Sequence, residues 1–335
     1  MTIDERVEAF EKLGNYLISI DEVTFEDLLN KVRNENPWFT HGSIRLALQG
    51  LNNYLDREKL KEWISGYQVN PSIPKRIAVV MAGNIPLAGF HDFLTVLMSG
   101  HAILIKLSSK DSVLLTFISS KLIEIEPRFE SLITIAAQLK NFDAVIATGS
   151  DNSARYFHYY FGKYPHIIRK NRTSCAVLTG SETQAELQLL GKDVFTYFGL
   201  GCRNVSKIFV PKDYDPVRLV KDWEIYADII HHHKYHNNYD YQMSILLINK
   251  IPFYDSGFVI LQESEKLVSP ISVVYYERYD SPDDLLAKLH VVFGKLQCVV
   301  GKSEPHFIPF GQAQFPELWD YADQVDTLKF LEKLR

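Results

Sequence analysis

RIAVVMAGNIPLAGFHDFLTVLMSGHAILIKLSSK, residues 76–110, is the stretch of sequence that decides the fold. Short apolar runs at 77–81 and 102–106 predict two strands, and the apolar spacing over 90–98 predicts a helix between them. A strand, a crossover helix and a second strand form the repeating unit of a parallel sheet. This stretch therefore predicts an α/β fold.

The same alternation extends in both directions. Towards the C-terminus the pattern predicts helices over 113–125, 151–161 and 185–190, and strands over 133–136, 144–147, 206–210, 245–247, 258–261 and 271–275. Residues 2–67 instead carry large apolar residues at helical spacing, and two prolines at 71 and 74 end that region. We therefore predict a helical N-terminal region over 1–75 and two α/β domains over 76–180 and 181–335.

Composition and charge exclude several classes of protein. A formal net charge of −5 and a pI near 6.1 provide no basic field for nucleic acid, so we expect small-molecule partners. The N-terminus is acidic and amphipathic rather than a basic and then apolar export signal, and no uncharged run reaches about 18 residues. We expect a cytoplasmic protein without a membrane span. The cysteines, Cys175, Cys202 and Cys298, are too scattered for a disulfide framework or a CxxC metal site.

Cys202 is the candidate nucleophile. It stands in Tyr197-Phe198-Gly199-Leu200-Gly201-Cys202-Arg203-Asn204-Val205-Ser206, between a helical segment and a strand. Glycines allow a tight turn, and a thiol on such a turn can attack a carbonyl. The alternative is a small buried residue that happens to lie near glycines. Cys175 and Cys298 lie in apolar strand segments and are interpreted as core residues.

Three further segments carry polar groups at strand ends. Asn84 follows the first strand, where its amide could donate to an oxyanion, although an Asx-turn or helix cap is the alternative. Lys106, followed by Ser108 and Ser109, could reach the ribose or phosphate of a cofactor, or could simply be solvated. Thr148-Gly149-Ser150 leads from a strand into a helix whose backbone N–H groups suit a pyrophosphate, as any serine-capped helix would.

In order and spacing, Asn84, Lys106, Ser150 and Cys202 resemble the motifs of the aldehyde dehydrogenase superfamily. The segments AGNIPL, RKNRTS and GCRNVS, at residues 82–87, 169–174 and 201–206, are most similar to the LuxC-type acyl-CoA reductases. The resemblance runs from about residue 76 to residue 210. It implies an aldehyde-dehydrogenase-like fold with a Rossmann-like cofactor domain at 76–180 and a catalytic domain at 181–335. The superfamily binds its cofactor without the usual dinucleotide glycine fingerprint, and that fingerprint is missing here.

The resemblance also implies roles for individual residues. Cys202 would be the nucleophile, and Asn84 would form the oxyanion hole together with the Cys202 backbone N–H. Lys106, with Ser108 and Ser109, would meet the adenosine ribose, and residues 148–150 would lie under the pyrophosphate. The implied reaction is reduction of an acyl-CoA, or of an acyl-carrier thioester, to an aldehyde by a nicotinamide cofactor. Oligomerisation or partner subunits are a further implication of the resemblance.

Two departures from the superfamily pattern refine this reading. Aldehyde-oxidising relatives carry a water-activating glutamate where this chain has residues 168–173, which hold no carboxylate. A thioester substrate removes the need for that base, because thiol exchange requires no activated water. NAD-preferring relatives often carry a carboxylate three residues after the ribose lysine, where this chain has Ser109 followed by Lys110. We therefore predict that NADPH is accepted, with NADH as the alternative.

Residues 231–241, HHHKYHNNYDY, form the most unusual tract of the chain. His232 and His236 are spaced like paired metal ligands on a helix, but no acidic third ligand follows, so no metal is predicted. One histidine of the tract could act as an acid or base for Cys202 or for the departing thiol. The PFG turn at 309–311 either returns an aromatic ring to the substrate or is an ordinary turn. Two rival functions stay open: a non-redox acyl transferase or thioesterase, and a catalytically silent binding protein of this fold.

Overall fold

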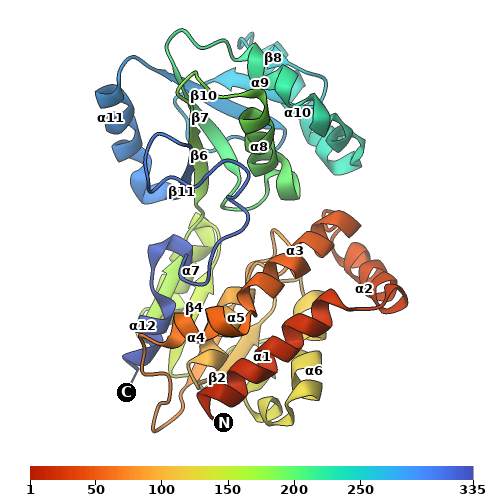
Figure 1. The fold of residues 1–335 in the computed structure, drawn as a ribbon, viewed down its shortest axis with the longest axis vertical. Helices are drawn as coiled ribbons and strands as arrows, with labels where there is room; N and C mark the ends of the chain where they lie inside the picture. The colour runs from red at the N-terminus through yellow and green to blue at the C-terminus, as the bar shows by residue number, and fades with distance from the viewer. Residues whose placement is uncertain (335) are drawn as a thin grey trace. The chain divides into compact units, whose positions relative to one another are not determined.

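The computed structural model describes residues 1–334, which form two compact units (Figure 1). Unit 1 comprises Met1–Asn171 and the C-terminal segment that begins at Glu317, and unit 2 comprises Arg172–Pro316. Each unit holds one sheet flanked by helices, which confirms the predicted α/β class. The sequence-based divisions fell at residues 75 and 180, whereas the compact units divide after Asn171 and again after Pro316.

Unit 1 begins with four helices, as the apolar spacing predicted: α1 (Ile3–Ile18), α2 (Glu22–Glu35), α3 (His41–Tyr54) and α4 (Arg57–Ile64). Each helix begins after a Thr or Asp whose side chain accepts a hydrogen bond from a first-turn N–H. Their apolar faces belong to the same core as the sheet. Phe10 of α1, for example, makes edge contacts with Phe93 and Phe129, at centroid distances of 6.5 and 5.6 Å.

The sheet of unit 1 is parallel, with strand order β3-β2-β1-β4-β5. Both of its faces are covered, as parallel sheets require. Ile77 and Val79 of β1 face the helical core, whereas Ala78 faces Phe157 and Phe161 of α7. The elements of this part are β1 (Arg76–Val80), α5 (Phe90–Met98), β2 (Ala102–Lys106), α6 (Val113–Ile125), η1 (Pro127–Ser131), β3 (Ile133–Ile135), β4 (Ala144–Thr148), α7 (Asp151–Phe161) and β5 (His166–Arg169).

The C-terminal segment belongs to unit 1 and packs against its helices. It contains η5 (Ala322–Gln324) and α12 (Thr327–Glu332), and Figure 1 shows it in blue beside the orange α4. Trp63 Nε1 donates to the Tyr321 hydroxyl over 2.8 Å. The buried Arg169 guanidinium donates to Asp92 and, over 2.9 Å, to Thr327 Oγ1. Arg169 therefore ties the end of β5 to α5 and to the C-terminal segment.

Unit 2 holds a six-stranded sheet of order β11-β6-β7-β10-β9-β8, parallel except for the antiparallel edge pair β8 and β9. Its core joins α8 to the central strands through Leu187, Leu190, Ile208 and Val210. Its elements are β6 (Thr173–Val177), α8 (Gln184–Phe195), η2 (Thr196–Gly199), β7 (Val205–Pro211), α9 (Val217–Asp222), η3 (Glu224–His231), α10 (His233–Ile248), β8 (Tyr254–Asp255), β9 (Ile260–Glu263), β10 (Val273–Tyr279), α11 (Pro282–Val292), η4 (Phe293–Lys295) and β11 (Leu296–Val300).

One predicted strand is wrong. Residues 245–247 lie in the last turns of α10 rather than in a strand. The buried residues Tyr235, Tyr239 and Leu246 recur at helical steps, so packing of that face selects the helix, while Leu247 and Ile248 are exposed. A short apolar run at the end of a helix cannot be distinguished from a strand by its periodicity alone. No helix within residues 1–334 combines the length and the apolar character needed to cross a bilayer.

Candidate active site

Most of the predicted site residues of unit 1 lie where its strand order reverses. The chain runs from β1 outwards to β2 and β3, and then returns to place β4 on the other side of β1. Ligands of open α/β sheets bind beyond the carboxyl ends of the strands at such a switch point. Asn84 follows β1, Lys106 ends β2 and Gly149 follows β4. The fold thus brings these three residues to the side of the sheet formed by the carboxyl ends of its strands.

The turn that carries Asn84 is closely packed. A Cβ added to Gly83 would lie 2.4 Å from Ser108 Oγ, so only glycine allows the two strand-end loops to approach this closely. Leu87 has a left-handed φ of 59°, and its N–H donates to Asp111 Oδ2 over 2.7 Å. Asn84 itself is exposed. The local packing therefore fixes the backbone of the turn while the Asn84 side chain reaches the surface.

Asp111, in the loop between β2 and α6, is a buried partner of this turn that the sequence did not reveal. Its side chain is almost fully enclosed, and burial raises its pKa to about 7, although the hydrogen bond from Leu87 opposes the shift. Nothing local in the sequence distinguishes Asp111 from a solvated loop aspartate. Its role depends on Leu87, which lies 24 residues away along the chain.

This raised pKa predicts a pH-dependent stability. An aspartate with a folded pKa near 7 and an ordinary value of 3.8 binds its proton more tightly in the folded chain, so its contribution to stability is largest below about pH 4 and is lost as the pH rises through about 7. Asp111→Asn keeps an acceptor for Leu87 and removes the buried charge. We expect the variant to gain about 1 to 3 kcal/mol over the parent at pH 8.5, and much less at pH 5.

Thermal unfolding from pH 5 to pH 8.5 measures this effect. Asp27→Asn, at an exposed position of α2, is the matched control and should leave the melting profile unchanged. An advantage of Asp111→Asn that is equal at both ends of the pH range would contradict a role for the charge.

The predicted cofactor-binding residues stand at the carboxyl ends of β2 and β4. Lys106 and Ser109 are exposed, Ser108 is half-buried, and Lys106 Nζ donates to the Ala137 carbonyl over 3.1 Å. Ser108 Oγ accepts from Lys110 N over 3.2 Å, which orders the loop. An exposed ammonium among hydroxyls is a donor set that suits ribose hydroxyls or a phosphate.

Residues Thr148, Gly149 and Ser150 connect β4 to α7. Ser150 is the N-cap of α7, and its Oγ accepts from Ser153 N over 3.1 Å. Asp151 in the first turn adds a negative charge beside the helix N-terminus, so an anion bound here would depend on backbone N–H groups and on cations from neighbouring loops. The sequence allowed Ser150 to cap α7 or the start of α7 to bind an anion. The structure shows the serine cap.

In unit 2, Cys202 lies on a strained loop between η2 and β7. Tyr197, Phe198 and Gly199 all have left-handed φ values, of 52°, 59° and 75°. This conformation is unfavourable for the tyrosine and the phenylalanine, and such strain gathers at functional sites. Cys202 is exposed. The alternative of a small buried residue therefore does not apply to it.

The other two cysteines are placed differently. Cys175 is fully buried in β6, and burial raises the pKa of its thiol far above the ordinary range, which makes it a poor nucleophile. Cys298 is half-buried in β11, with its Sγ 3.0 Å from Ser174 Oγ. The same hydroxyl donates to the Cys202 carbonyl over 3.0 Å. Ser174 thus links the loop of Cys202 to β11, a contact that the sequence analysis did not foresee.

Asn204 and Asp193 are two further residues of this region whose roles were not predicted from the sequence. Both are buried, Asn204 at the end of the Cys202 loop and Asp193 in the last turn of α8. Asn204 hydrogen-bonds within the loop, and the Asp193 carboxylate accepts from Gly311 N over 2.6 Å and from Ala313 N over 3.0 Å. The PFG turn at 309–311 is therefore attached to α8, and Phe310 is buried in the core of unit 2. Of the two interpretations of the PFG turn, the structure shows an ordinary turn with a packed phenylalanine.

The histidine tract opens α10, and one of its members contacts the Cys202 loop. The His232 ring lies 4.3 Å from the Phe198 ring, measured between centroids. His236 is exposed, with its Nε2 3.5 Å from an Asp240 oxygen. Within residues 1–334 the only trio with metal-ligand geometry is Glu22, Glu26 and His41, all exposed on α2 and α3. His232 is accordingly the histidine of the tract with a direct contact to the loop.

Residues 43–219, which make up more than half of the chain, match the family model of the LuxC acyl-CoA reductases. The chain belongs to the LuxC acyl-CoA reductase family. The matched range begins in α3 and ends in α9, so it includes Asn84, Lys106, Gly149 and Cys202. The family resemblance inferred from sequence is thereby confirmed, and family and fold together support an oxidoreductase that acts in aldehyde chemistry. No curated protein sequence matches the chain.

Solved structures similar to this LuxC-family chain are aldehyde dehydrogenases. One from Mycobacterium tuberculosis in complex with NAD+ has a TM-score of 0.67 at 12% identity, covering 93% of this chain and 76% of that one. One from Bacillus cereus in complex with NAD+ has a TM-score of 0.63 at 13% identity, covering 91% and 72%. The NADP-dependent glyceraldehyde-3-phosphate dehydrogenase from Bacillus halodurans in complex with NADP has a TM-score of 0.64 at 12% identity, covering 91% and 75%. At these identities the likeness shows the fold, and the predicted aldehyde-dehydrogenase-like fold is confirmed.

Proposed function

We propose that this chain reduces an acyl thioester, most simply an acyl-CoA, to an aldehyde by means of NAD(P)H and a covalent thioester at Cys202. In this proposal unit 1 binds the cofactor and unit 2 carries the nucleophile. The observation that carries it is the exposed thiol of Cys202 on a strained, glycine-flanked loop in a chain of the LuxC family. A thiol is the nucleophile best suited to exchange with a thioester.

The first step is attack of the Cys202 thiolate on the thioester carbonyl, which forms the enzyme thioester and releases the thiol of CoA. Negative charge develops on the carbonyl oxygen during this step, and hydrogen-bond donors directed at that oxygen stabilise it. The Cys202 N–H is one such donor, and we propose the Asn84 side-chain amide as the second. His232, which contacts Phe198 on the Cys202 loop, is the histidine that we propose as a source of the proton for the departing thiol.

The second step converts the enzyme thioester to the aldehyde. When bound, the reduced nicotinamide supplies a hydride to the thioester carbon. The hemithioacetal anion formed at Cys202 collapses by re-forming its C=O bond and breaking its C–S bond, which frees the aldehyde and restores the Cys202 thiolate. Residues 168–173 hold no carboxylate, so this segment supplies no carboxylate base to activate water against the enzyme thioester.

The residues proposed to hold the cofactor present chemistry that fits it. Lys106 offers an exposed ammonium to the ribose hydroxyls, and Ser108 and Ser109 offer hydroxyls on the same loop. Backbone N–H groups at the start of α7, after Gly149, suit the pyrophosphate. All of these groups lie at the carboxyl ends of β2 and β4, on the two sides of β1.

A single assay tests the proposed function. Protein, NADPH and acyl-CoA are mixed, and the loss of absorbance of the reduced cofactor, free CoA and aldehyde are measured in the same sample. We expect all three to change in equal amounts. Release of CoA without oxidation of the cofactor would instead identify an acyl transferase or thioesterase, and no reaction with acyl chains of several lengths would favour a binding protein.

The cofactor loop yields a prediction about NADPH and NADH. Ser109 is exposed three residues after Lys106 and is followed by the exposed Lys110, so no carboxylate at that position repels a 2′-phosphate. We expect NADPH to be used at least as well as NADH. Ser109→Glu should lower kcat/KM for NADPH by about 10- to 100-fold, because it places a carboxylate beside that phosphate, and should change the NADH value little.

Steady-state kinetics with both cofactors measure this preference, and Ser109→Gln is the uncharged control of the same size. A parent enzyme that favours NADH by more than about tenfold would overturn the expectation.

A further inference from the structure

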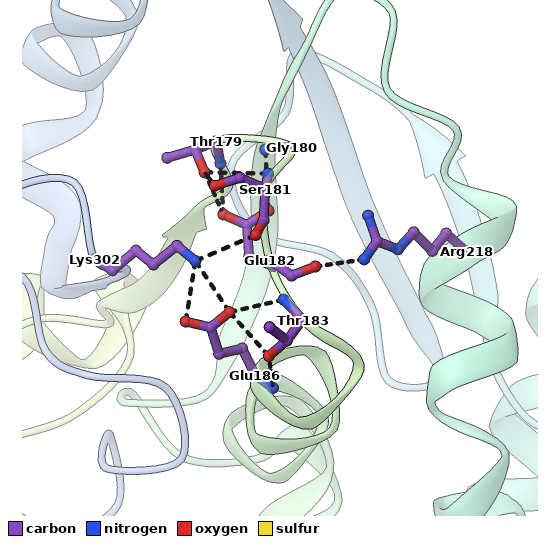
Figure 2. A network of polar contacts seen from close by, with 8 residues as sticks. All are labelled: Thr179, Gly180, Ser181, Glu182, Thr183, Glu186, Arg218 and Lys302. Carbon is purple, nitrogen blue, oxygen red and sulfur yellow. Dashed lines mark hydrogen bonds and ion pairs between the residues drawn. The ribbon is translucent and has the colours of Figure 1, made fainter.

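Helix α8, which leads into the Cys202 loop, is fixed at its N-terminus by a polar network (Figure 2). Thr183 and Glu186 form a capping box, and Lys302 Nζ lies 3.0 Å from the Glu186 carboxylate. The buried Glu182 accepts from Thr179 N over 2.7 Å, and its carbonyl accepts from Arg218. Lys302 and Glu186 form an ion pair, whereas the Glu182 carboxylate accepts from the neutral donors Thr179 and Gly180. This polar network restrains the N-terminal end of α8.

At the other end of α8 the buried side chain of Asn204 closes the Cys202 loop. Asn204 Nδ2 donates to the carbonyls of Thr196, Asp193 and Val194, over 2.8, 3.0 and 3.3 Å. Its Oδ1 accepts from Gly201 N over 2.8 Å. A single side chain therefore satisfies the last carbonyls of α8 and also the backbone just before Cys202.

These contacts surround the peptide group that carries the Cys202 N–H. That group joins Gly201 to Cys202. The N–H of Gly201, on the peptide before it, is held by Asn204, and the carbonyl of Cys202, on the peptide after it, is held by the Ser174 hydroxyl at 3.0 Å. With both neighbouring peptides held, the direction of the Cys202 N–H and the backbone position from which its thiol projects are restricted.

The loop would not hold this shape unaided. Left-handed backbone is unfavourable for residues with a Cβ such as Tyr197 and Phe198, and it persists only where the surroundings enforce it. Asp193 adds a second attachment, because its carboxylate accepts from Gly311 and Ala313 while its carbonyl accepts from Asn204. Asn204 is thus the residue at which α8 and the nucleophile loop are joined.

We propose that Asn204 is a positioning residue for the reaction at Cys202. It keeps residues 197–203 in the strained conformation that directs the Cys202 thiol and N–H, and Asp193 links the same structure to the turn at 309–313. This inference rests on the proposed function for its catalytic consequence. Its structural content, the immobilised loop, can be measured without any substrate.

Asn204→Ala tests the proposal, because it removes the donor to three carbonyls and the partner of Gly201 N. We expect the rate of acylation of Cys202 by acyl-CoA without cofactor, measured by mass spectrometry, to fall about 100-fold. KM for acyl-CoA should stay within about threefold, since substrate is still bound. Hydrogen exchange in the peptide 196–204 should become at least about tenfold faster.

Leu289→Ala is the matched control. Leu289 is buried in the core around α11 and belongs to a different cluster from the loop, so its truncation lowers the melting temperature of unit 2 without touching Asn204. We expect this variant to keep the parent acylation rate and the parent exchange rate over residues 196–204. A general loss of stability would instead affect both variants alike.

Asn204→Asp gives a second, pH-dependent test. The new carboxyl group still accepts from Gly201 N, but when ionised it turns an oxygen towards three carbonyls. Protonation restores a donor, so the acylation defect of N204D relative to the parent should shrink at least about fivefold between pH 8 and pH 6, while that of N204A should not. Simple loss of packing volume predicts no such difference.

The outcomes separate the two proposals. If the parent is not acylated by any acyl-CoA, the proposed function fails, and exchange over residues 196–204 still decides the role of Asn204 in the loop. Acylation within threefold of the parent in N204A, unchanged exchange in N204A, or the same changes in Leu289→Ala would each overturn the positioning role.

Discussion

Replacement of Cys202 by serine is expected to lower acyl-CoA-dependent NADPH oxidation at least about a thousandfold, equivalent to about 4 kcal/mol of transition-state stabilisation. A serine hydroxyl is almost never ionised near neutral pH, whereas a cysteine thiol forms the thiolate that attacks a thioester. Because the Cys202 side chain is exposed, the substitution removes little packing, and we expect the melting temperature to change by less than about 2 °C. The lost activity would therefore result from loss of the nucleophile and not from unfolding.

Cys298→Ser is the control for this experiment. Cys298 is half-buried against Ser174 and is not the proposed nucleophile, so its variant should retain most of the activity. Mass spectrometry of the acylated protein should place the acyl group on the peptide that contains Cys202 in the parent and in Cys298→Ser, and on no peptide in Cys202→Ser. Turnover above about one tenth of the parent in Cys202→Ser would end the proposal of covalent catalysis at this position.

The first βαβ unit was predictable because its pattern is local. The helices 90–98, 113–125 and 151–161 and the strand 102–106 have the predicted bounds in the structure. Each is a strongly periodic or β-branched run that ends near glycine, serine or a charged residue, so the sequence neighbours alone determine where it stops. The strand-end positions of Asn84 and Lys106 followed from these elements.

The residues that support the site were harder to predict from the sequence. Asp193 binds Gly311 from 118 positions away, and no local pattern in α8 reveals that partner. Asp111 similarly depends on Leu87 in another loop. These contacts exist only after the chain has folded, so a single sequence presents both residues as ordinary surface aspartates.

Asn204 is an intermediate case, because the partners of its side chain lie no more than 11 residues away in the chain. Gly201, which it contacts through Oδ1, is only 3 residues away. An asparagine shortly after a glycine often bonds to nearby backbone, so a local turn could have been proposed from sequence. That it also caps the end of α8 depends on the left-handed conformation of residues 197–199, which the sequence did not indicate because two of these three are aromatic.

The second large effect is expected at Asn84. Removal of one oxyanion donor typically lowers kcat by about 100- to 1000-fold, so Asn84→Ala should slow acylation of Cys202 by that factor while KM for acyl-CoA changes little. Asn84→Asp should be at least as slow, because it keeps the shape of the side chain but directs an acceptor, and at neutral pH a negative charge, at the oxygen where charge develops.

The structure of unit 1 makes this test a clean one. The backbone around Asn84 is fixed from elsewhere, by the close contact of Gly83 with Ser108 and by the hydrogen bond from Leu87 to Asp111, and the Asn84 side chain is exposed. We therefore expect Asn84→Ala to melt within about 2 °C of the parent.

Asn53→Ala, at an exposed position of α3, is the matched asparagine control, and it should change neither the acylation rate nor the melting temperature. If Asn84→Ala acylates at the parent rate, Asn84 does not donate to the oxyanion, and the Cys202 N–H must then act with a different donor. If instead KM rises and kcat is unchanged, Asn84 binds the substrate equally in the ground state and in the transition state.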